Sequence, residues 1–271
     1  MHECGGGPAA NAAYLLSRWG VSCGLAASLG ADAYGDCIVA EFAAVGADIA
    51  LVDRNPAGMS PVSAILVNQY NGSRTIINRK AAGGRPLKLE RELLRGSAPR
   101  VMLFDGHELD ASLQAIELFP SALTILDAGS LRAGTRELSK RVDYLVSSER
   151  FACQMSEVPN LESRENQVKA MAALYKCNGK PVVVTRGERG MLRGDGASIQ
   201  HFPAFPVHAV DTTGAGDIFH GAFAYGVLTG LPSEETLRLA AAAAALSVTM
   251  RGGRPSIPAL SQVQEMLDHA G

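Results

Sequence analysis

The chain has 271 residues, of which 47% are hydrophobic and 19% charged, enough to bury a sizeable core in one large α/β domain. Its 25 Lys and Arg residues nearly balance 27 Asp and Glu residues, giving a net charge of −2 without a basic run, so neither a nucleic-acid nor a membrane-surface partner is predicted. The longest apolar stretch, residues 239–248, is too short to span a bilayer, and five cysteines without a CxxC pair are typical of a reduced, cytoplasmic protein.

Helices and apolar strands alternate in the first part of the chain. Apolar spacing predicts a helix over 8–19, with Pro8 suited to its first position. A second helix is predicted over 35–45, and short apolar runs at 21–28 and 48–53 are expected to be buried strands. This alternation predicts a mostly parallel sheet covered by helices.

The stretch 62–79 interrupts this alternation. Two runs rich in β-formers, 62–68 and 74–78, flank Tyr70-Asn71-Gly72-Ser73, and Asn-Gly between such runs is a strong hairpin signal. We therefore expect an inserted β-hairpin. The pattern leaves open whether it is a plain edge hairpin or a lid over a site.

The alternation of strands and helices then resumes. The remaining predicted elements are strands at 100–104, 122–127, 142–146 and 181–185, helices at 109–118, 132–140 and 164–177, a hairpin of 190–193 and 198–202, and helices at 215–229, 233–249 and 259–268. Because no linker or repeat divides the chain, a single domain over 1–271 is predicted, with 62–79 as an insertion.

Asp211-Thr212-Thr213-Gly214-Ala215-Gly216-Asp217 precedes the predicted helix 215–229. The first N–H groups of a helix have no intrahelical partner and carry partial positive charge, and small residues let a phosphate approach them. Asp217 beside such a site would accept a proton from a nucleophile that attacks the phosphate. The same residues also suit an ordinary capped helix with tight packing, and alone they do not decide between the two interpretations.

Two other glycine-rich segments are candidate ligand sites. In Gly5-Gly6-Gly7-Pro8-Ala9-Ala10-Asn11, the backbone of Gly6 and Gly7 and the side chain of Asn11 could contact a small polar ligand, or the segment could be a flexible terminus. Its G-x-G-x-x-A pattern, with Asp32 further on, also fits a dinucleotide fingerprint, but that motif needs a preceding strand and only four residues precede Gly5. Thr185-Arg186-Gly187-Glu188-Arg189-Gly190 ends a predicted parallel strand, where ligands commonly bind, or is a simple turn.

Together these three segments resemble the ribokinase-like carbohydrate kinases, the PfkB family. Asp211 to Asp217 with the following Ile218-Phe219-His220-Gly221-Ala222 resembles the C-terminal signature of that family. Gly6-Gly7 with Asn11, Gly30 and Gly35 resembles its N-terminal signature, and Thr185-x-Gly187-x-x-Gly190 its nucleotide-binding turn. The resemblance implies a ribokinase-like three-layer α/β/α domain with a small β-hairpin lid.

The resemblance also implies roles for individual residues. Asp217 would deprotonate the sugar hydroxyl, and the N–H groups of Gly214, Ala215 and Gly216 would form the anion hole. The implied ligand contacts are Gly6, Gly7 and Asn11 for the sugar, Thr185, Gly187 and Gly190 for ATP, and Asp211, Thr213 and Ser256 for a monovalent cation such as K⁺. The lid over 62–79 would also form a homodimer interface.

The chain departs from the family pattern in two places. Ser147-Ser148-Glu149-Arg150-Phe151 replaces an Asn-x-x-Glu motif that organises Mg²⁺, leaving Glu149 as the candidate for that network. A similar serine-containing segment occurs in the ketohexokinase and sulfofructose kinase branches, which favours a ketose such as fructose as the substrate. Family members also carry a strand, an acidic sugar ligand and the first lid strands before the glycine pair, so either the start codon is misplaced or the N-terminal core strand is missing.

The sequence thus predicts an ATP-dependent kinase of a small sugar, with Mg²⁺ as a cofactor and Asp217 as the base. The departures leave one alternative, a catalytically impaired or truncated relative that binds nucleotide or sugar without turnover. A nicotinamide-dependent oxidoreductase is disfavoured.

Overall fold

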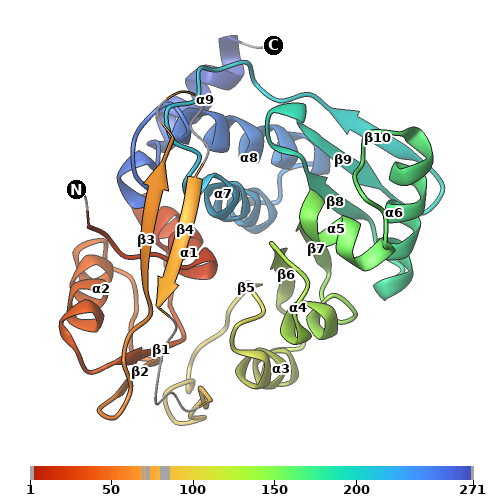
Figure 1. The fold of residues 1–271 in the computed structure, drawn as a ribbon. Helices are drawn as coiled ribbons and strands as arrows, with labels where there is room; N and C mark the ends of the chain where they lie inside the picture. Colours follow the sequence, from red (N-terminus) through yellow and green to blue (C-terminus); the bar gives the residue numbers. More distant parts are fainter. Residues whose placement is uncertain (1–2, 69, 71–73, 80–85, 270–271) are drawn as a thin grey trace. The chain divides into compact units, whose positions relative to one another are not determined.

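The computed structural model describes residues 3–68, 70, 74–79 and 86–269. Its contacts divide the chain into two compact units, which are described separately: unit 1 is Met1–Ser97 with Val207–Gly271, and unit 2 is Ala98–Pro206 (Figure 1). The single domain over 1–271 therefore stays a prediction. Among the described residues, no helix combines the length and the apolar character needed to cross a membrane.

Unit 1 contains five α-helices among its described residues, and two of them pack on α7. Their bounds are α1 (Pro8–Arg18), α2 (Ala33–Ala44), α7 (Ala215–Thr229), α8 (Ser233–Ser247) and α9 (Leu260–His269). Helix α7 contacts both α1 and α8, and α8 contacts α9 (Figure 1). The approach of α7 to α1 is close, because a Cβ on Gly221 would lie 3.1 Å from backbone atoms of Ala12. All five helices lie within two residues of their predicted bounds.

Strands β1 (Ala27–Gly30) and β2 (Val52–Asn55) pair in parallel in unit 1. The predicted strands at 21–28 and 48–53 are therefore wrong in their bounds, and the earlier residues of both runs contribute only the bridge between Gly24 and Asp48. The first apolar run begins while the chain is still completing the end of α1, since the N–H of Val21 donates to the Leu16 carbonyl at 3.0 Å. Burial of Leu25 in the small core around α2 explains its apolar character without strand pairing.

Strands β3 (Val62–Val67) and β4 (Arg74–Arg79) form the predicted antiparallel hairpin, in which Val62 is opposite Arg79 and Val67 opposite Arg74. The predicted Asn-Gly turn lies outside the described residues. At the base of the hairpin, Arg79 donates to the Ser60 carbonyl at 3.2 Å and lies 5.6 Å from the ring centre of Tyr34. The hairpin is therefore connected to the start of α2.

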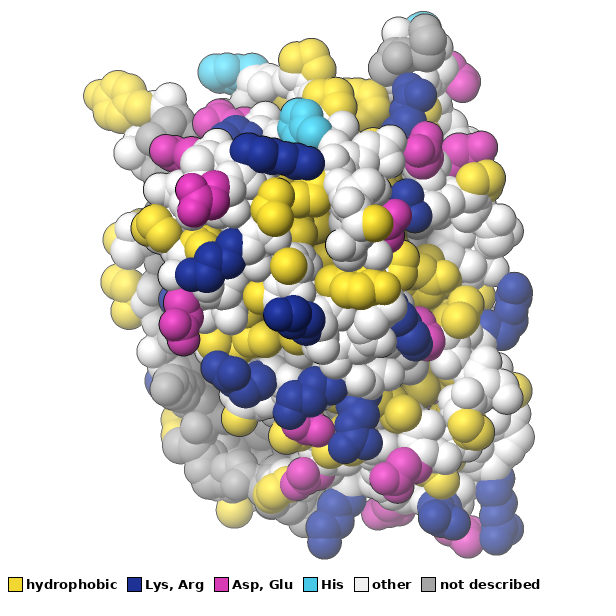
Figure 2. Space-filling model, turned by 90° about the vertical axis from the view of Figure 1, so that its right-hand side faces the viewer, with side chains coloured by type: hydrophobic (Ala, Val, Ile, Leu, Met, Phe, Trp, Pro, Cys, Tyr) yellow, Lys and Arg dark blue, Asp and Glu magenta, His cyan; other side chains and the backbone are white. Residues whose placement is uncertain are grey.

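Unit 2 is built on a six-stranded sheet with the order β10-β9-β8-β7-β6-β5. Its elements are β5 (Val101–Phe104), α3 (Leu109–Leu118), β6 (Leu123–Ala128), α4 (Ala133–Leu138), β7 (Tyr144–Ser148), α5 (Glu149–Ser156), α6 (Arg164–Asn178), β8 (Val182–Thr185), β9 (Met191–Gly194) and β10 (Ile199–Phe202). Strands β5 to β8 are parallel, whereas β9 and β10 are antiparallel, so the sheet is mixed. Basic and acidic side chains are scattered over the face shown in Figure 2.

Helix α5 is the one α-helix of unit 2 that the sequence pattern did not predict. It begins directly after β7, and the Ser148 side chain caps it by accepting the Phe151 N–H at 3.1 Å. Serine before an acidic first-turn residue is a helix-start signal that was available in the sequence. The segment 147–151 therefore contains the end of β7 and the N-terminus of a helix.

Candidate functional site

The N-terminus of α7 lies in unit 1 and has the features expected of an anion site. Its N-cap is Gly214 at φ 76°, a left-handed conformation that favours glycine. The first intrahelical hydrogen bond runs from the Ile218 N–H to the Gly214 carbonyl at 2.9 Å, and the Ala215 N–H makes only a long contact of 3.4 Å with the Thr212 carbonyl. Apart from its two chain neighbours and the backbone of its own helix, no described atom lies within 4 Å of a Cβ placed on Gly216. This helix end therefore has room for an anion.

Asp217 in the first turn of α7 is held by Asn11 of α1. The Asn11 amide nitrogen donates to Oδ2 of Asp217 at 2.7 Å, across 206 residues of sequence. A Cβ on Gly214 would lie 3.8 Å from that oxygen and 3.9 Å from the amide nitrogen, so the glycine faces both groups. Asn11 is 6% exposed. The structure thus brings the predicted base, a predicted sugar contact and the start of the anion site together.

The glycine pair that precedes α1 has a different local setting at each position. Gly7 is the N-cap of α1 at φ 101°, and no side chain caps the helix there. Gly6 is exposed, and a Cβ on it would meet no described atom within 4 Å. Both therefore leave the backbone before Asn11 accessible, which is compatible with their predicted role in sugar contact.

The three predicted cation ligands lie on two neighbouring loops. The carboxylate of Asp211 accepts the Thr213 N–H at 2.9 Å and the Gly252 N–H at 2.9 Å, which joins the loops. Ser256 is buried and its hydroxyl donates to the Gly253 carbonyl at 2.8 Å. The hydroxyl oxygen of Thr213 is buried without a hydrogen-bond partner among the described residues. An unsatisfied buried oxygen beside a carboxylate fits a hard cation.

Two interactions at this site were missed by the sequence analysis. His220 is 3% exposed, and its Nδ1 lies 2.6 Å from the Gly216 carbonyl. A carbonyl only accepts, so Nδ1 carries the proton and fixes the first turn of α7. Arg254 is also 3% exposed and donates through Nε to Oδ1 of Asn11 at 3.1 Å. A histidine in an apolar helix and an arginine in a glycine loop gave no signal of either contact.

The predicted nucleotide-binding turn belongs to unit 2. Thr185 ends β8, and its hydroxyl donates to the Ser147 carbonyl at 3.3 Å. Gly187 at φ 61° begins a 3₁₀ turn, and a Cβ on it would meet no described atom within 4 Å. Packing alone explains the glycine at position 190, which has φ 75°, because a Cβ there would overlap the Phe202 carbonyl of β10. Gly187 is therefore the better candidate for close approach of a ligand.

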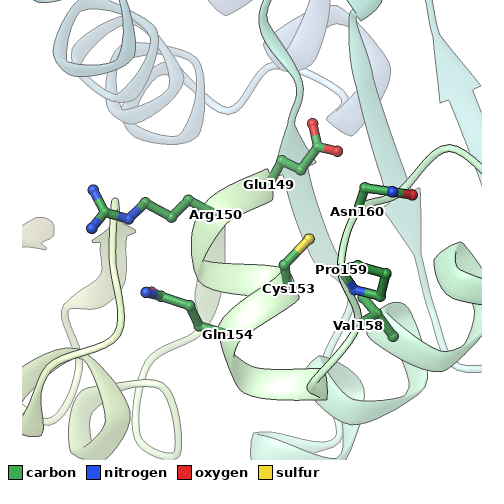
Figure 3. Close-up of a pocket in the computed structure, with 7 residues that line it drawn as sticks. All are labelled: Glu149, Arg150, Cys153, Gln154, Val158, Pro159 and Asn160. Carbon is green, nitrogen blue, oxygen red and sulfur yellow. The ribbon is translucent and has the colours of Figure 1, made fainter.

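Glu149 lies in the first turn of α5, beside an open pocket of about 530 Å³ that also includes Cys153 and Asn160 (Figure 3). One carboxylate oxygen accepts the Leu161 N–H at 3.1 Å, and the other pairs with Arg189. Burial raises the pKa of the Cys153 thiol and the charge of Glu149 raises it further, so the thiol stays protonated at neutral pH.

The predicted role of Glu149 in a Mg²⁺ network stays a prediction. Both of its oxygens are engaged, one of them by a cation. Among the described residues, no group of three His, Cys, Asp or Glu side chains could hold a metal ion. Proteins often bind Mg²⁺ through one or two carboxylates and the phosphates of a substrate.

Comparison with known proteins shows the family. The model of the pfkB family carbohydrate kinases matches residues 1–260. Ribokinase of Haemophilus influenzae is 26% identical over 98% of this chain and 88% of the relative, and deoxyribokinase of Salmonella typhi is 28% identical over 97% and 87%. The structure of Arabidopsis thaliana ribokinase complexed with ribose and ATP has a TM-score of 0.83 at 28% identity, covering 97% of this chain and 88% of its own.

The chain belongs to the pfkB family of carbohydrate kinases, and it is a sugar kinase of the ribokinase type. The predicted family and the predicted ribokinase-like α/β fold with a central sheet and helices are confirmed. The chain is therefore a phosphotransferase, as predicted, and the disfavoured oxidoreductase interpretation does not apply.

Proposed function

We propose that the protein transfers the γ-phosphoryl group of ATP to a hydroxyl of a small sugar, with Asp217 as the general base. The observation that carries this proposal is the Asn11–Asp217 hydrogen bond of 2.7 Å at an open helix N-terminus. Asp217 accepts the hydroxyl proton as the sugar oxygen attacks the γ-phosphorus. The new oxygen–phosphorus bond forms while the bond from that phosphorus to the bridging oxygen of ADP breaks.

The other residues of unit 1 supply positioning and electrostatic stabilisation. Asn11 holds one oxygen of the Asp217 carboxylate, and this carboxylate accepts the proton of the sugar hydroxyl. The N–H groups of Gly214, Ala215 and Gly216, with the partial positive charge of the α7 N-terminus, stabilise the charge on the transferred phosphoryl group. The backbone of Gly6 and Gly7 contacts the sugar. Thr185 and Gly187 in unit 2 are proposed to seat the nucleotide.

A pentose is the proposed substrate class. Support comes from the relatives, one named ribokinase and one deoxyribokinase, and from the ribose-bound Arabidopsis structure. A ketose such as fructose is the second candidate, favoured by the segment 147–151 that resembles the ketohexokinase branch. Steady-state kinase assays with ribose, 2-deoxyribose and fructose, following ADP and sugar phosphate, decide between them by kcat/KM. ATP binding without sugar phosphate from any sugar would instead favour the non-catalytic alternative.

A monovalent cation such as K⁺ is proposed to bind Asp211, Thr213 and Ser256. The Thr213 hydroxyl oxygen is buried without a partner among the described residues, and this supports the proposal because the oxygen would coordinate the cation. Titration of K⁺ into enzyme prepared in a large-cation buffer is expected to raise kcat. Identical kcat with and without K⁺, together with an unchanged melting temperature, would contradict it.

A homodimer through the hairpin is proposed from its exposed apolar side chains. Leu66 is 61% exposed and Ile77 59%. Ala64 lies two residues before Leu66 and therefore shares its face of β3. Because Ala64 is directly opposite Ile77 on β4, Leu66 and Ile77 lie on the same face of the hairpin. Such a face invites association with a second apolar surface. Leu66→Asp is expected to dissociate the dimer in sedimentation experiments. A monomeric wild-type protein at micromolar concentration would contradict the proposal.

A further inference from the structure

Four polar side chains of unit 1 form a continuous chain that ends on the proposed base. The guanidinium of Arg254 pairs with the carboxylate of Glu41 through Nη1. Its Nε donates to Oδ1 of Asn11 at 3.1 Å, and Nδ2 of Asn11 donates to Oδ2 of Asp217 at 2.7 Å. These residues come from α2, the loop before α9, α1 and α7. The chain therefore connects the catalytic turn to three other segments.

Arg254 is held by packing and by its pairing with Glu41, whereas its Nη2 is buried without a hydrogen-bond partner among the described residues. Its guanidinium carbon lies 5.0 Å from the ring centre of Tyr14 and 4.7 Å from that of Phe42, and the side chain is 3% exposed. A Cβ on Gly5 would overlap the guanidinium, so the N-terminal glycine segment packs directly on it. Aromatic faces and a carboxylate are the partners that a buried arginine needs. The position of its Nε–H is thus set by packing rather than by Asn11.

The chemistry of the chain allows only one orientation of the Asn11 amide. Arginine only donates hydrogen bonds and an ionised carboxylate only accepts them. The amide oxygen must therefore face Arg254, and the amide nitrogen must face Asp217. A flipped amide would place its oxygen against the Asp217 carboxylate and its nitrogen against the Arg254 Nε–H. Without Arg254, only Asp217 would select the orientation.

We infer that Arg254 is a positioning residue for phosphoryl transfer, acting through Asn11 to hold the carboxylate of Asp217. This inference rests on the proposed role of Asp217 as the base. Arg254 itself does not touch the reacting atoms; it fixes the amide that carries Asp217. Since a small misplacement of a reacting group is costly in rate, the effect of Arg254 is expected in kcat.

The test is Arg254→Lys, which keeps a positive charge for Glu41 but loses the planar donor to Asn11. We expect kcat to fall roughly 10- to 100-fold with little change in the KM for ATP. The matched control is Arg54→Lys. Arg54 also donates to a carbonyl, that of Gly30 at 3.1 Å, and to a carboxylate, that of Asp36. It contacts none of the four side chains that link Glu41 to Asp217. The control is expected to keep kcat within about twofold.

A double-variant cycle separates positioning from general support of the fold. In an Asn11→Ala background, Arg254→Lys is expected to lower kcat no further, because the residue through which it acts is gone. Multiplicative losses of kcat in the double variant would overturn the inference. Melting temperatures of all variants are measured, and kcat is compared at a temperature at which every variant is folded. The comparison can therefore still be made if Arg254→Lys lowers the stability.

Asp217→Asn distinguishes failure of this inference from failure of the proposed function. If Asp217→Asn retains turnover, the base assignment is wrong and there is nothing for Arg254 to position. If Asp217→Asn is inactive while folded Arg254→Lys keeps the wild-type kcat, only the role of Arg254 is overturned.

Discussion

Gly216 offers a way to separate an anion site from an ordinary helix start. It is the second residue of α7, and a Cβ placed on it would meet no described atom within 4 Å apart from its chain neighbours and the backbone of its own helix. In a helix, Cβ tilts toward the N-terminus, which is the direction from which the transferred phosphoryl group would approach. Gly216→Ala therefore introduces a methyl group that harms no described contact of the free protein.

Two opposite effects are expected from Gly216→Ala. Replacing a helical glycine by alanine is worth about 0.5–1 kcal/mol of stability, which corresponds to a rise in melting temperature of about 1–4 °C for a chain of this size. A methyl group at the anion site keeps the phosphoryl group from its N–H donors, and loss of one such donor costs on the order of 10²-fold in kcat. Stability should therefore rise while turnover falls.

The assay combines a thermal melt with steady-state kinase kinetics on ribose. A variant that is both more stable and fully active would refute the reasoning, because α7 would then be only a capped helix. A variant that is less stable would show that the space beside Gly216 is not open in solution. Only the combination of higher stability and lower kcat agrees with an anion site.

Two further predictions concern stability. Gly226→Ala places a Cβ 2.8 Å from side-chain atoms of Thr236; overpacking of about 1–3 kcal/mol should exceed the gain in helix propensity, so thermal melts should show a lower melting temperature, with kcat of the folded enzyme unchanged. Asp32 accepts hydrogen bonds from Gly35 and Ser60, which lower its pKa from 3.8 to about 2. Its contribution to stability is therefore present above pH 4 and lost as the pH falls toward 2, so the stability difference between wild type and Asp32→Asn should shrink over that interval in denaturant titrations; a constant difference would contradict it.

The sequence predicted elements best where the periodic pattern and the end signals agreed. Helix α7 begins and ends at the predicted residues, because Gly214 precedes its apolar pattern and Gly230 follows it, both in left-handed conformations. The first strand was misplaced because an apolar run does not reveal which of its residues pair. Here the N–H of Val21 still donates to the Leu16 carbonyl at the end of α1, so the strand begins later in the sequence than the apolar run does.

The proposed catalytic turn, 211–217, could be recognised because its residues are adjacent in sequence, whereas the residues that contact it are not. Asn11 and Arg254 are 243 residues apart, and their contact depends on the packing of α1 on the loop before α9. Glu41 lies on a helix where a charge usually faces solvent, and only the structure shows that it accepts the Gly5 N–H and pairs with Arg254. Long-range polar chains of this kind leave no local pattern to recognise.

The central claim is that Asp217 is the base of a sugar kinase, and Asp217→Asn tests it most directly. The amide keeps the shape of the side chain but cannot accept the hydroxyl proton as a carboxylate does. We predict that kcat falls by about 10²- to 10⁴-fold, the usual contribution of general base catalysis, while ATP binding measured by calorimetry stays near the wild-type value. Turnover within a few-fold of wild type would contradict the claim.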